Sequence, residues 1–403
     1  MQGLAMEKQS KCGALEFGQA QLNMCTIFAS YGNPQPAKGR ISAQALKFHS
    51  WSACALRKLL PILAALPLAC ASIPVQGDRH KVMTSDDWAL TVEHLPSLNA
   101  AAKKKYPVLI CHGLGANREY FKAKDEDSLV RNLQRAGYDV WLMDLRGRVE
   151  AGETGYWFGK HTYTYNIDAY IEHDLDAALS FVLQQTGAQK VNYIGHSMGG
   201  IIMYARLGTQ RESRVANLVT IASPMSFLPY NDWTFKLYRM RGGMAILPAL
   251  PLRPGAFIAS IVPETLYAPF ANAFYNPENT DARVKAQLLR KAINNISKNE
   301  IKQFIYMTEN AGLYSADGKI NYREELKNIT VPAYLVAGRR DELADPAVVR
   351  DVYERLGSKD KTLEIFSRAD GLVDDYGHTD LIFGKQAHKE VHPKIIEWLN
   401  KRN

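Results

Sequence analysis

A serine between two glycines is the feature of this chain that best suits covalent chemistry. Residues 193–200 read YIGHSMGG, which places the pattern Gly-x-Ser-x-Gly around Ser197. Small residues on both sides allow a sharp strand-to-helix turn that lifts the hydroxyl toward a base. A helix that begins directly after the serine points its first NH groups at any oxyanion formed there. We predict that Ser197 is a nucleophile and that the Met198 NH stabilises the oxyanion; a chance match in a glycine-rich loop is the alternative.

A second glycine-rich segment, HGLGAN at residues 112–117, follows an apolar run with the composition of a buried strand. Such a loop can turn one of its backbone NH groups toward the nucleophile, because glycines permit a close approach. We expect the Leu114 NH to be the second oxyanion donor. An ordinary glycine-rich turn after a strand would have the same sequence.

Two aspartates compete for the role of the acid that orients a catalytic histidine. Asp345 precedes Pro346, which is the pattern of a helix N-cap with proline in the first turn, so its predicted role is structural. Asp341 lies closer than Asp345 to the end of the predicted strand at 331–337, where a carboxylate can reach a histidine across the edge of the sheet. We predict that Asp341 is the acid.

Three histidines follow these aspartates: His378, His388 and His392. His378 lies in the glycine-flanked stretch YGHTD after the last predicted strand, a setting that suits a general base. His388 and His392 share one face of the predicted C-terminal helix, but no third ligand accompanies them, and we expect solvated histidines rather than a metal site. The predicted triad is Ser197, Asp341 and His378, with no metal and no organic cofactor.

Composition and charge are those of an ordinary globular protein. The chain has 403 residues, of which 46% are hydrophobic and 22% charged, and its formal net charge is +8. Residues 1–80 hold eight Lys and Arg against three Asp and Glu, so more than half of the excess precedes the predicted domain. Because the remainder is nearly balanced, we expect no nucleic-acid partner and interpret Lys103, Lys104 and Lys105 as a solvated turn.

Cysteine usage indicates a domain without disulfides. Four of the five cysteines precede residue 80, which leaves Cys111 alone in the predicted domain. No bridge can then close within the domain. We expect Cys111 to be a small buried thiol at the end of a strand.

The first part of the chain carries two predictions of its own. Residues 1–55 mix Gly, Gln, Ser, Pro and Lys without periodicity and are predicted to be disordered. Residues 56–72 run from basic to apolar to small, the order of a secretory signal, with an Ala-x-Ala cleavage site or an imperfect lipoprotein site at Cys70. We predict that the protein is exported and is periplasmic, secreted or anchored to a membrane. A buried helix or an amphipathic anchor is the alternative for this run, and a cytoplasmic protein is the alternative for the location.

Strands alternate with helices through most of the chain, a rhythm that predicts an α/β domain with a mostly parallel sheet over residues 81–403. The predicted strands lie at 88–92, 105–111, 138–145, 190–194, 215–222, 331–337 and 362–366, and the predicted helices at 127–137, 166–187, 201–207 and 347–356.

The alternation of predicted strands and helices is interrupted between residues 225 and 310, where prolines cluster among apolar side chains. An insertion of this kind is typical of a cap or lid. Its apolar residues could line an acyl-chain pocket, contact a lipid surface or close a small core of their own. They include Trp233, Phe235, Tyr238, Phe257, Ile258, Ile261, Leu266, Tyr267, Phe270 and Phe274.

From about Tyr106 to the C-terminus the sequence resembles the α/β-hydrolase superfamily, whose nucleophile, acid and base follow one another in the order found here. The segment YDVWL with Arg146-Gly147, and the segment GHTDLIFG at 377–384, are similar to acid lipases and related bacterial lipases and esterases. The resemblance implies an α/β-hydrolase fold: a mostly parallel central sheet, flanking helices and a helical cap. A fainter likeness extends to polyhydroxyalkanoate synthases, which carry cysteine where this chain has Ser197.

The resemblance implies a serine hydrolase that cleaves carboxylic esters of apolar acids or lipids through an acyl-enzyme on Ser197. Its partners would be a small-molecule or lipid ester and, through the lid, a lipid interface. The alternatives are an acyltransferase with the same triad and a non-catalytic binding protein on the same fold. Acid lipases carry Gln after the nucleophile where this chain has Met198, so triglyceride specificity is not implied.

Overall fold

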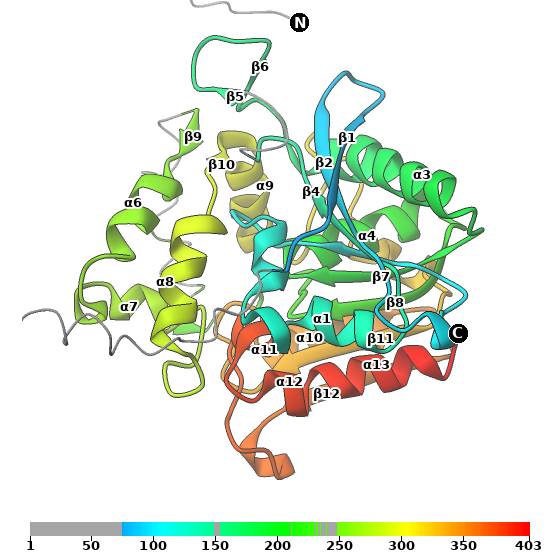
Figure 1. Cartoon of the computed structure of the whole chain (residues 1–403). Helices are drawn as coiled ribbons and strands as arrows, with labels where there is room; N and C mark the ends of the chain where they lie inside the picture. The colour runs from blue at the N-terminus through cyan, green and yellow to red at the C-terminus, as the bar shows by residue number, and fades with distance from the viewer. Residues whose placement is uncertain are drawn as a thin grey trace, which may run out of the picture. The chain divides into compact units, whose positions relative to one another are not determined.

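The computed structural model describes residues 75–148, 154–210, 212–229, 231, 232, 234, 239 and 248–403, with Pro269 and Phe270 described for their backbone alone. The predicted extension at 1–55 and the signal-like segment at 56–72 lie outside these residues. Trp233, Phe235 and Tyr238 also lie outside them. Residues Cys70–Asn403 form one compact unit, drawn in Figure 1.

An eight-stranded sheet in the order β1-β2-β4-β3-β7-β8-β11-β12 forms the centre of this unit. The strands from β4 to β12 pair in parallel, and β1 and β2 extend one edge through antiparallel pairs. The mostly parallel sheet predicted from the sequence is therefore confirmed. The strands are β1 (Asp78–Met83), β2 (Ala89–Leu95), β3 (Val108–Cys111), β4 (Val140–Asp144), β7 (Val191–His196), β8 (Val215–Ile221), β11 (Ala333–Gly338) and β12 (Lys361–Phe366).

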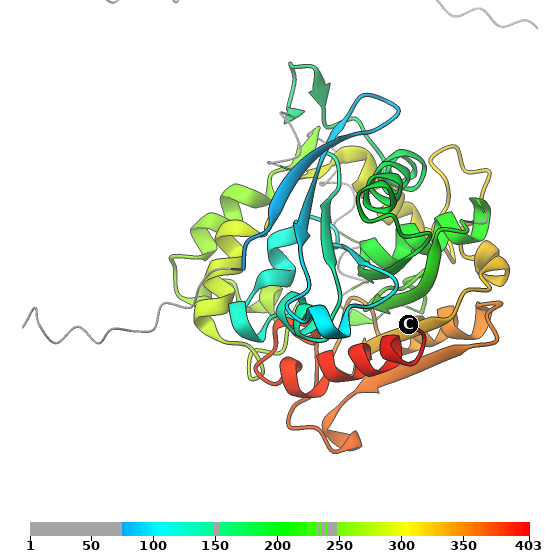
Figure 2. The ribbon, with the colours of Figure 1, turned by 45° about the vertical axis from the view of Figure 1, so that its right-hand side comes forward.

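Helices cover both faces of the sheet (Figure 1, Figure 2). On one face α1 (Leu129–Arg135) packs against α13 (His392–Asn400), and on the other lie α3 (Leu175–Thr186), α4 (Met198–Gln210) and α10 (Pro346–Arg355). Because both faces are covered, β3, β7 and β11 are buried along their full length. No helix among the described residues is long and apolar enough to cross a membrane.

The helix predicted at 166–187 forms in three consecutive parts. The Asn166 side chain accepts the Ala169 NH at the start of α2 (Ile167–Ala169), and Gly187, at a φ of +67°, ends α3. Between them Tyr170–Asp174 form one π-helical turn, which periodicity does not reveal. The turn presents Asp174 to Arg146, and the two form a buried ion pair at 2.7 Å.

The chain after β8 forms a helical segment beside the sheet, which we call the cap segment and define as residues 248–310. Helix α6 (Leu252–Ala259) packs on α8 (Ala282–Lys291), with α7 (Ala268–Ala271) between them in sequence. The short strands β9 (Ala249–Leu250) and β10 (Ile296–Ser297) pair just before α9 (Lys298–Glu309). Several apolar side chains of the cap segment are 43–73% exposed, so they do not close a core of its own: Phe257, Ile258, Ile261, Leu266 and Phe274.

The parallel strands bring the predicted site residues to one edge of the sheet, because their carboxyl ends lie together there. His112 follows β3, Ser197 follows β7, Asp341 follows β11 and His378 lies beyond β12. The fold thus collects residues that are far apart in the sequence.

Candidate active site

Ser197 lies at the turn from β7 to α4 with a φ of +51°. Non-glycine residues seldom adopt this left-handed conformation, and those that do are concentrated at functional sites. The flanking glycines are required by packing. A Cβ on Gly195 would lie 2.5 Å from the Gly200 nitrogen, and one on Gly199 would lie 2.4 Å from the Cys111 oxygen.

The loop after β3 passes directly beside this turn. A Cβ on Gly113 would lie 3.1 Å from the Ser197 Cβ and 3.1 Å from the His196 Nδ1. Among the described residues, neither the Leu114 NH nor the Met198 NH has a hydrogen-bond partner. For Met198 this follows from its place as the first residue of α4. Both predicted oxyanion donors are therefore available to a ligand.

His112 fixes the loop that carries Leu114. Its Nε2 accepts the Leu145 NH at 3.2 Å, so the proton is on Nδ1, which donates to the Gly113 oxygen at 2.9 Å. Burial and the nearby Arg148 hold the pKa of His112 well below its usual value. The side chain is a neutral histidine with a structural role.

Asp341 and His378 meet at the carboxyl edge of the sheet. The Asp341 Oδ2 lies 2.9 Å from the His378 Nδ1, while its Oδ1 accepts the NH groups of Leu343 at 2.8 Å and Ala344 at 2.7 Å. Both side chains of the pair are buried. The carboxylate is thus held by its own loop and holds one face of the imidazole, which leaves Nε2 as the nitrogen that could take a proton.

The predicted nucleophile and the predicted base are connected through His196. Within the part of the chain that the structure describes, no hydrogen bond joins the Ser197 hydroxyl to His378. The His196 Nε2 instead lies 3.0 Å from the His378 oxygen, and the two imidazole rings have their centroids 4.9 Å apart. Hydrogen bonds between catalytic residues are often long when no substrate is bound, so the missing bond between Ser197 and His378 is compatible with a triad.

The other candidates have structural positions. Asp345 caps α10, because its side chain accepts the Ala347 NH at 2.8 Å, as the Asp-Pro pattern predicted. Cys111 is buried, and burial raises the pKa of its thiol to about 12. In the described ranges no group of three His, Cys, Asp or Glu residues could hold a metal ion.

The expectation of two solvated histidines near the C-terminus was wrong for His392. The C-terminal helix is divided into α12 (Ala387–Glu390) and α13, and His392 is buried at the start of the latter. Its Nε2 donates to the Ile382 oxygen at 2.8 Å, and burial lowers its pKa to about 3. His388 is partly exposed on α12. The i, i+4 spacing gave no sign that the helix breaks between them.

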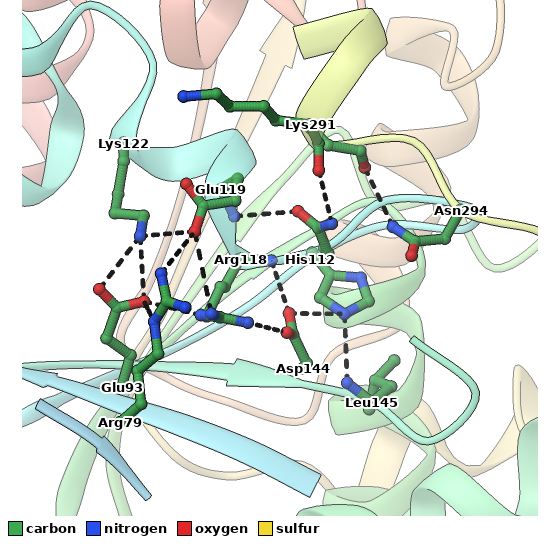
Figure 3. A network of polar contacts seen from close by, with 12 residues as sticks. Arg79, Glu93, His112, Arg118, Glu119, Lys122, Asp144, Leu145, Lys291 and Asn294 are labelled. Carbon is green, nitrogen blue, oxygen red and sulfur yellow. Dashed lines mark hydrogen bonds and ion pairs between the residues drawn. The ribbon is translucent and has the colours of Figure 1, made fainter. Parts of the chain in front are cut away.

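A buried network of charged side chains supports the loop after β3, and the sequence did not predict it (Figure 3). Arg118 donates to the carboxylates of Asp144 and, at 2.7 Å, Glu93, and its backbone NH donates to Asp144 at 2.7 Å. Lys122 adds bonds of 3.0 Å to both oxygens of Glu93. The network links β2, β4 and the 3-10 helix η3 (Arg118–Lys122), which directly follows the HGLGAN loop in the chain. Each member is an ordinary charged residue in sequence, and only the fold brings them together.

The cap segment bonds to the same loop. The Asn294 NH donates to the Gly115 oxygen at 2.7 Å, and the Asn117 side chain donates to the Lys291 oxygen at 2.8 Å. Figure 3 shows Lys291 and Asn294 beside the loop. The cap segment therefore contacts the backbone that would supply one oxyanion donor.

Two family models match the chain. The model described as alpha/beta hydrolase fold matches residues 106–385, and the model described as partial alpha/beta-hydrolase lipase region matches residues 69–125.

Similar sequences include gastric triacylglycerol lipase from Bos taurus, which is 24% identical over 364 residues, covering 79% of this chain and 87% of that protein. Lipase 3 from Drosophila melanogaster is 24% identical over 362 residues, covering 79% of this chain and 89% of that protein.

Among solved structures, the monoacylglycerol lipase of Paleococcus ferrophilus aligns with a TM-score of 0.52 at 18% identity, covering 78% of this chain and 99% of that chain. A thermophilic esterase from Thermogutta terrifontis aligns with a TM-score of 0.52 at 16% identity, covering 80% of this chain and 98% of that chain. At these identities the likeness shows a shared fold.

Proposed function

The chain belongs to the alpha/beta hydrolase fold family and is a carboxylic ester hydrolase of the lipase and esterase kind, and on this premise we propose that Ser197 is its nucleophile. The left-handed turn at Ser197 supports this assignment most. Strained backbone persists only where surrounding structure enforces it, and here packed glycines enforce it around one hydroxyl.

In the proposed mechanism His378 takes the proton of Ser197 as the hydroxyl attacks the ester carbonyl. Asp341 holds the imidazole in the tautomer with the proton on Nδ1 and stabilises the imidazolium that forms. The NH groups of Met198 and Leu114 stabilise the oxyanion of the tetrahedral intermediate. The alcohol leaves with the proton from His378, and water then releases the acid from the acyl-enzyme by the same steps.

We propose apolar acyl groups or lipids as the substrate class. The exposed apolar side chains of the cap segment support this, because they lie on its surface and remain open to solvent. The named lipases among the similar proteins support it as well. The residue after the nucleophile is Met198, so the proposal does not include a preference for triglycerides.

An acyltransferase that uses the same acyl-enzyme is the second candidate, because the triad forms the same intermediate in both cases. Release of p-nitrophenol from short- and long-chain esters, measured with and without an added alcohol, distinguishes the two. Formation of free acid as the main product supports a hydrolase. Transfer of the acyl group to the alcohol in preference to water supports the alternative, and absence of p-nitrophenol release from every chain length contradicts both.

We also propose that residues 56–72 direct export, because their order of basic, apolar and small residues is that of a secretory signal. N-terminal sequencing of the protein from its native host tests this. A chain that begins near Cys70 or Ser72 supports export, and a chain that retains residues 1–55 contradicts it.

A further inference from the structure

His196 lies between three parts of the candidate active site. It precedes Ser197 in the chain, its Nε2 is 3.0 Å from the backbone oxygen of His378, and its Nδ1 faces Gly113 of the loop that carries Leu114. The side chain is buried. No other described side chain bonds to that oxygen.

The bond to His378 fixes the proton of His196. A carbonyl oxygen can only accept, so the His196 Nε2 carries the proton and donates it. The Nδ1 is then unprotonated, and among the described residues it has no hydrogen-bond partner although it is buried. Burial, and then the nearby His378, hold the pKa of His196 well below its usual value. The ring is therefore neutral, with its single proton donated to the His378 oxygen.

Tyr120 contacts both the His196 ring and the loop that carries His378. Its ring stacks on His196 with centroids 5.1 Å apart, and its hydroxyl donates to the Thr379 oxygen at 3.3 Å. The backbone oxygens of two consecutive residues, His378 and Thr379, are therefore bonded by two stacked side chains. Tyr120 itself belongs to η3, directly after the loop that carries Leu114.

We propose that His196 is a positioning residue that fixes the backbone of His378 relative to the Ser197 turn. The inference rests on the proposed function, because it assigns a role in the transfer of the Ser197 proton. His378 has two constraints on its location: Asp341 orients its ring, and His196 holds its main chain. Without the bond from His196, the His378 ring can be oriented correctly by Asp341 and still lie at the wrong distance from the Ser197 hydroxyl.

Proton transfer depends steeply on this distance, so loss of the His196 bond should lower kcat without changing the binding of substrate. His196→Leu removes the donor and keeps an apolar side chain of similar size. We expect kcat for a short, soluble p-nitrophenyl ester to fall about 100-fold with KM unchanged, the effect of a displacement of about 1 Å. His196→Gln places an amide NH near the former Nε2, and we expect it to restore kcat to within about tenfold of the parent.

His392→Leu is the matched control. It removes a buried, neutral histidine whose Nε2 also donates to a backbone oxygen, that of Ile382 at 2.8 Å. The His392 Nδ1 also accepts a bond from the Asn132 side chain at 3.0 Å, so we expect this variant to lower the melting temperature at least as much as His196→Leu does, with kcat unchanged. Equal loss of kcat in the two variants, or parental kcat in His196→Leu, would overturn the proposal. So would a His196→Gln variant that folds but is no more active than His196→Leu.

A fluorophosphonate probe separates this inference from the proposed function. If Ser197 of the parent does not react with the probe, the nucleophile assignment fails. If the parent reacts and His196→Leu reacts at the same rate, the nucleophile stands and the positioning role fails. Should neither His196 variant fold, Tyr120→Phe decides: it keeps the stacked ring and loses the bond to Thr379, and an unchanged rate of labelling would overturn the proposal.

Discussion

The carboxylate of Asp341 divides its two oxygens between different tasks: one bonds the His378 ring at 2.9 Å, and the other accepts two backbone NH groups of its own loop. The loop bonds fix the carboxylate, so the histidine meets an acceptor that cannot rotate away. This relationship distinguishes Asp341 from Asp345, whose side chain is used to cap α10.

Asp341→Asn should lower kcat about a thousandfold or more. The amide oxygen can take over the bonds from Leu343 and Ala344, which leaves the NH₂ group facing the His378 Nδ1 and favours the wrong tautomer. Asp345→Ala should keep kcat and lose about 1 kcal/mol of stability with the helix cap. Ester hydrolysis and thermal unfolding of both variants test the assignment, and the reverse pattern would exchange the two roles.

Ser197→Ala should abolish ester cleavage while the protein folds. Ser197→Gly should also be inactive but more stable than Ser197→Ala by about 1 kcal/mol, because glycine adopts a φ of +51° without the penalty that a Cβ brings. Differential scanning calorimetry of the two variants measures this difference. Activity above a tenth of the parent in either variant would refute the nucleophile.

Gly113→Ala should lower kcat about 100-fold by moving the loop that carries the Leu114 NH. The new Cβ would lie 3.1 Å from both Ser197 and His196, which is tighter than an ordinary contact, so the loop or these neighbours must give by a few tenths of an ångström. Gly187→Ala is the control, since nothing lies within 4 Å of its added Cβ and its φ of +67° makes the cost one of stability alone. Parental activity in Gly113→Ala would remove Leu114 as the donor.

Stability should fall between pH 4 and pH 7 through Asp380. Burial raises the pKa of this carboxyl from 3.8 to about 6, where it accepts NH groups of Asn276 and Gly377. Because the pKa of Asp380 is higher in the folded than in the unfolded state, this group adds about 3 kcal/mol to the free energy of unfolding at pH values below 3.8. That contribution is lost as the pH rises through about 6. Asp380→Asn removes the titration, so it should destabilise the protein more at pH 5 than at pH 7.5. Urea unfolding at both values provides the measurement, and an equal difference at both would contradict the assignment.

Replacing Phe257, Ile258 and Ile261 together by serine should depress activity on long-chain or aggregated esters far more than on short soluble ones. These side chains are 57–63% exposed on and just after α6, so the change removes apolar surface without opening a core. Val373→Ser, at a residue 59% exposed outside the cap segment, is the control for general loss of apolar surface. A parallel loss on both substrate classes would indicate that these residues stabilise the cap segment instead.

The parts of the fold that follow from local rules were predictable from the sequence. The turn at Ser197 needs flanking glycines, the start of α10 needs a capping side chain, and parallel strands need apolar runs; each requirement is visible as a residue type at a fixed spacing. Asp341 and His378 were predicted as the acid and the base because both follow the ends of predicted strands. The fold does bring the two side chains into contact, and their catalytic roles remain a proposal.

The features that were missed depend on contacts between distant segments. Glu93, Arg118 and Asp144 are buried only because β2, β4 and η3 meet, and nothing local marks them. The burial of His392 depends on Ile382, which lies in the short helix α11 (Asp380–Phe383). His196 was read only as one of the variable positions of Gly-x-Ser-x-Gly, since its partner is the backbone of a loop far along the chain.

The bonds that join Asn294 to Gly115 and Asn117 to Lys291 limit how this enzyme can be recombined with its relatives. A chimera that exchanges residues 252–271 replaces α6 and α7 and leaves both bonds intact. A chimera that exchanges residues 282–310 replaces the backbone that supplies the Asn294 NH and the Lys291 oxygen, so the incoming segment must place the same backbone groups against HGLGAN for both bonds to form again. Under the proposed function, the first exchange should change the acyl-chain preference and leave the contacts with HGLGAN untouched, whereas the second should change both together.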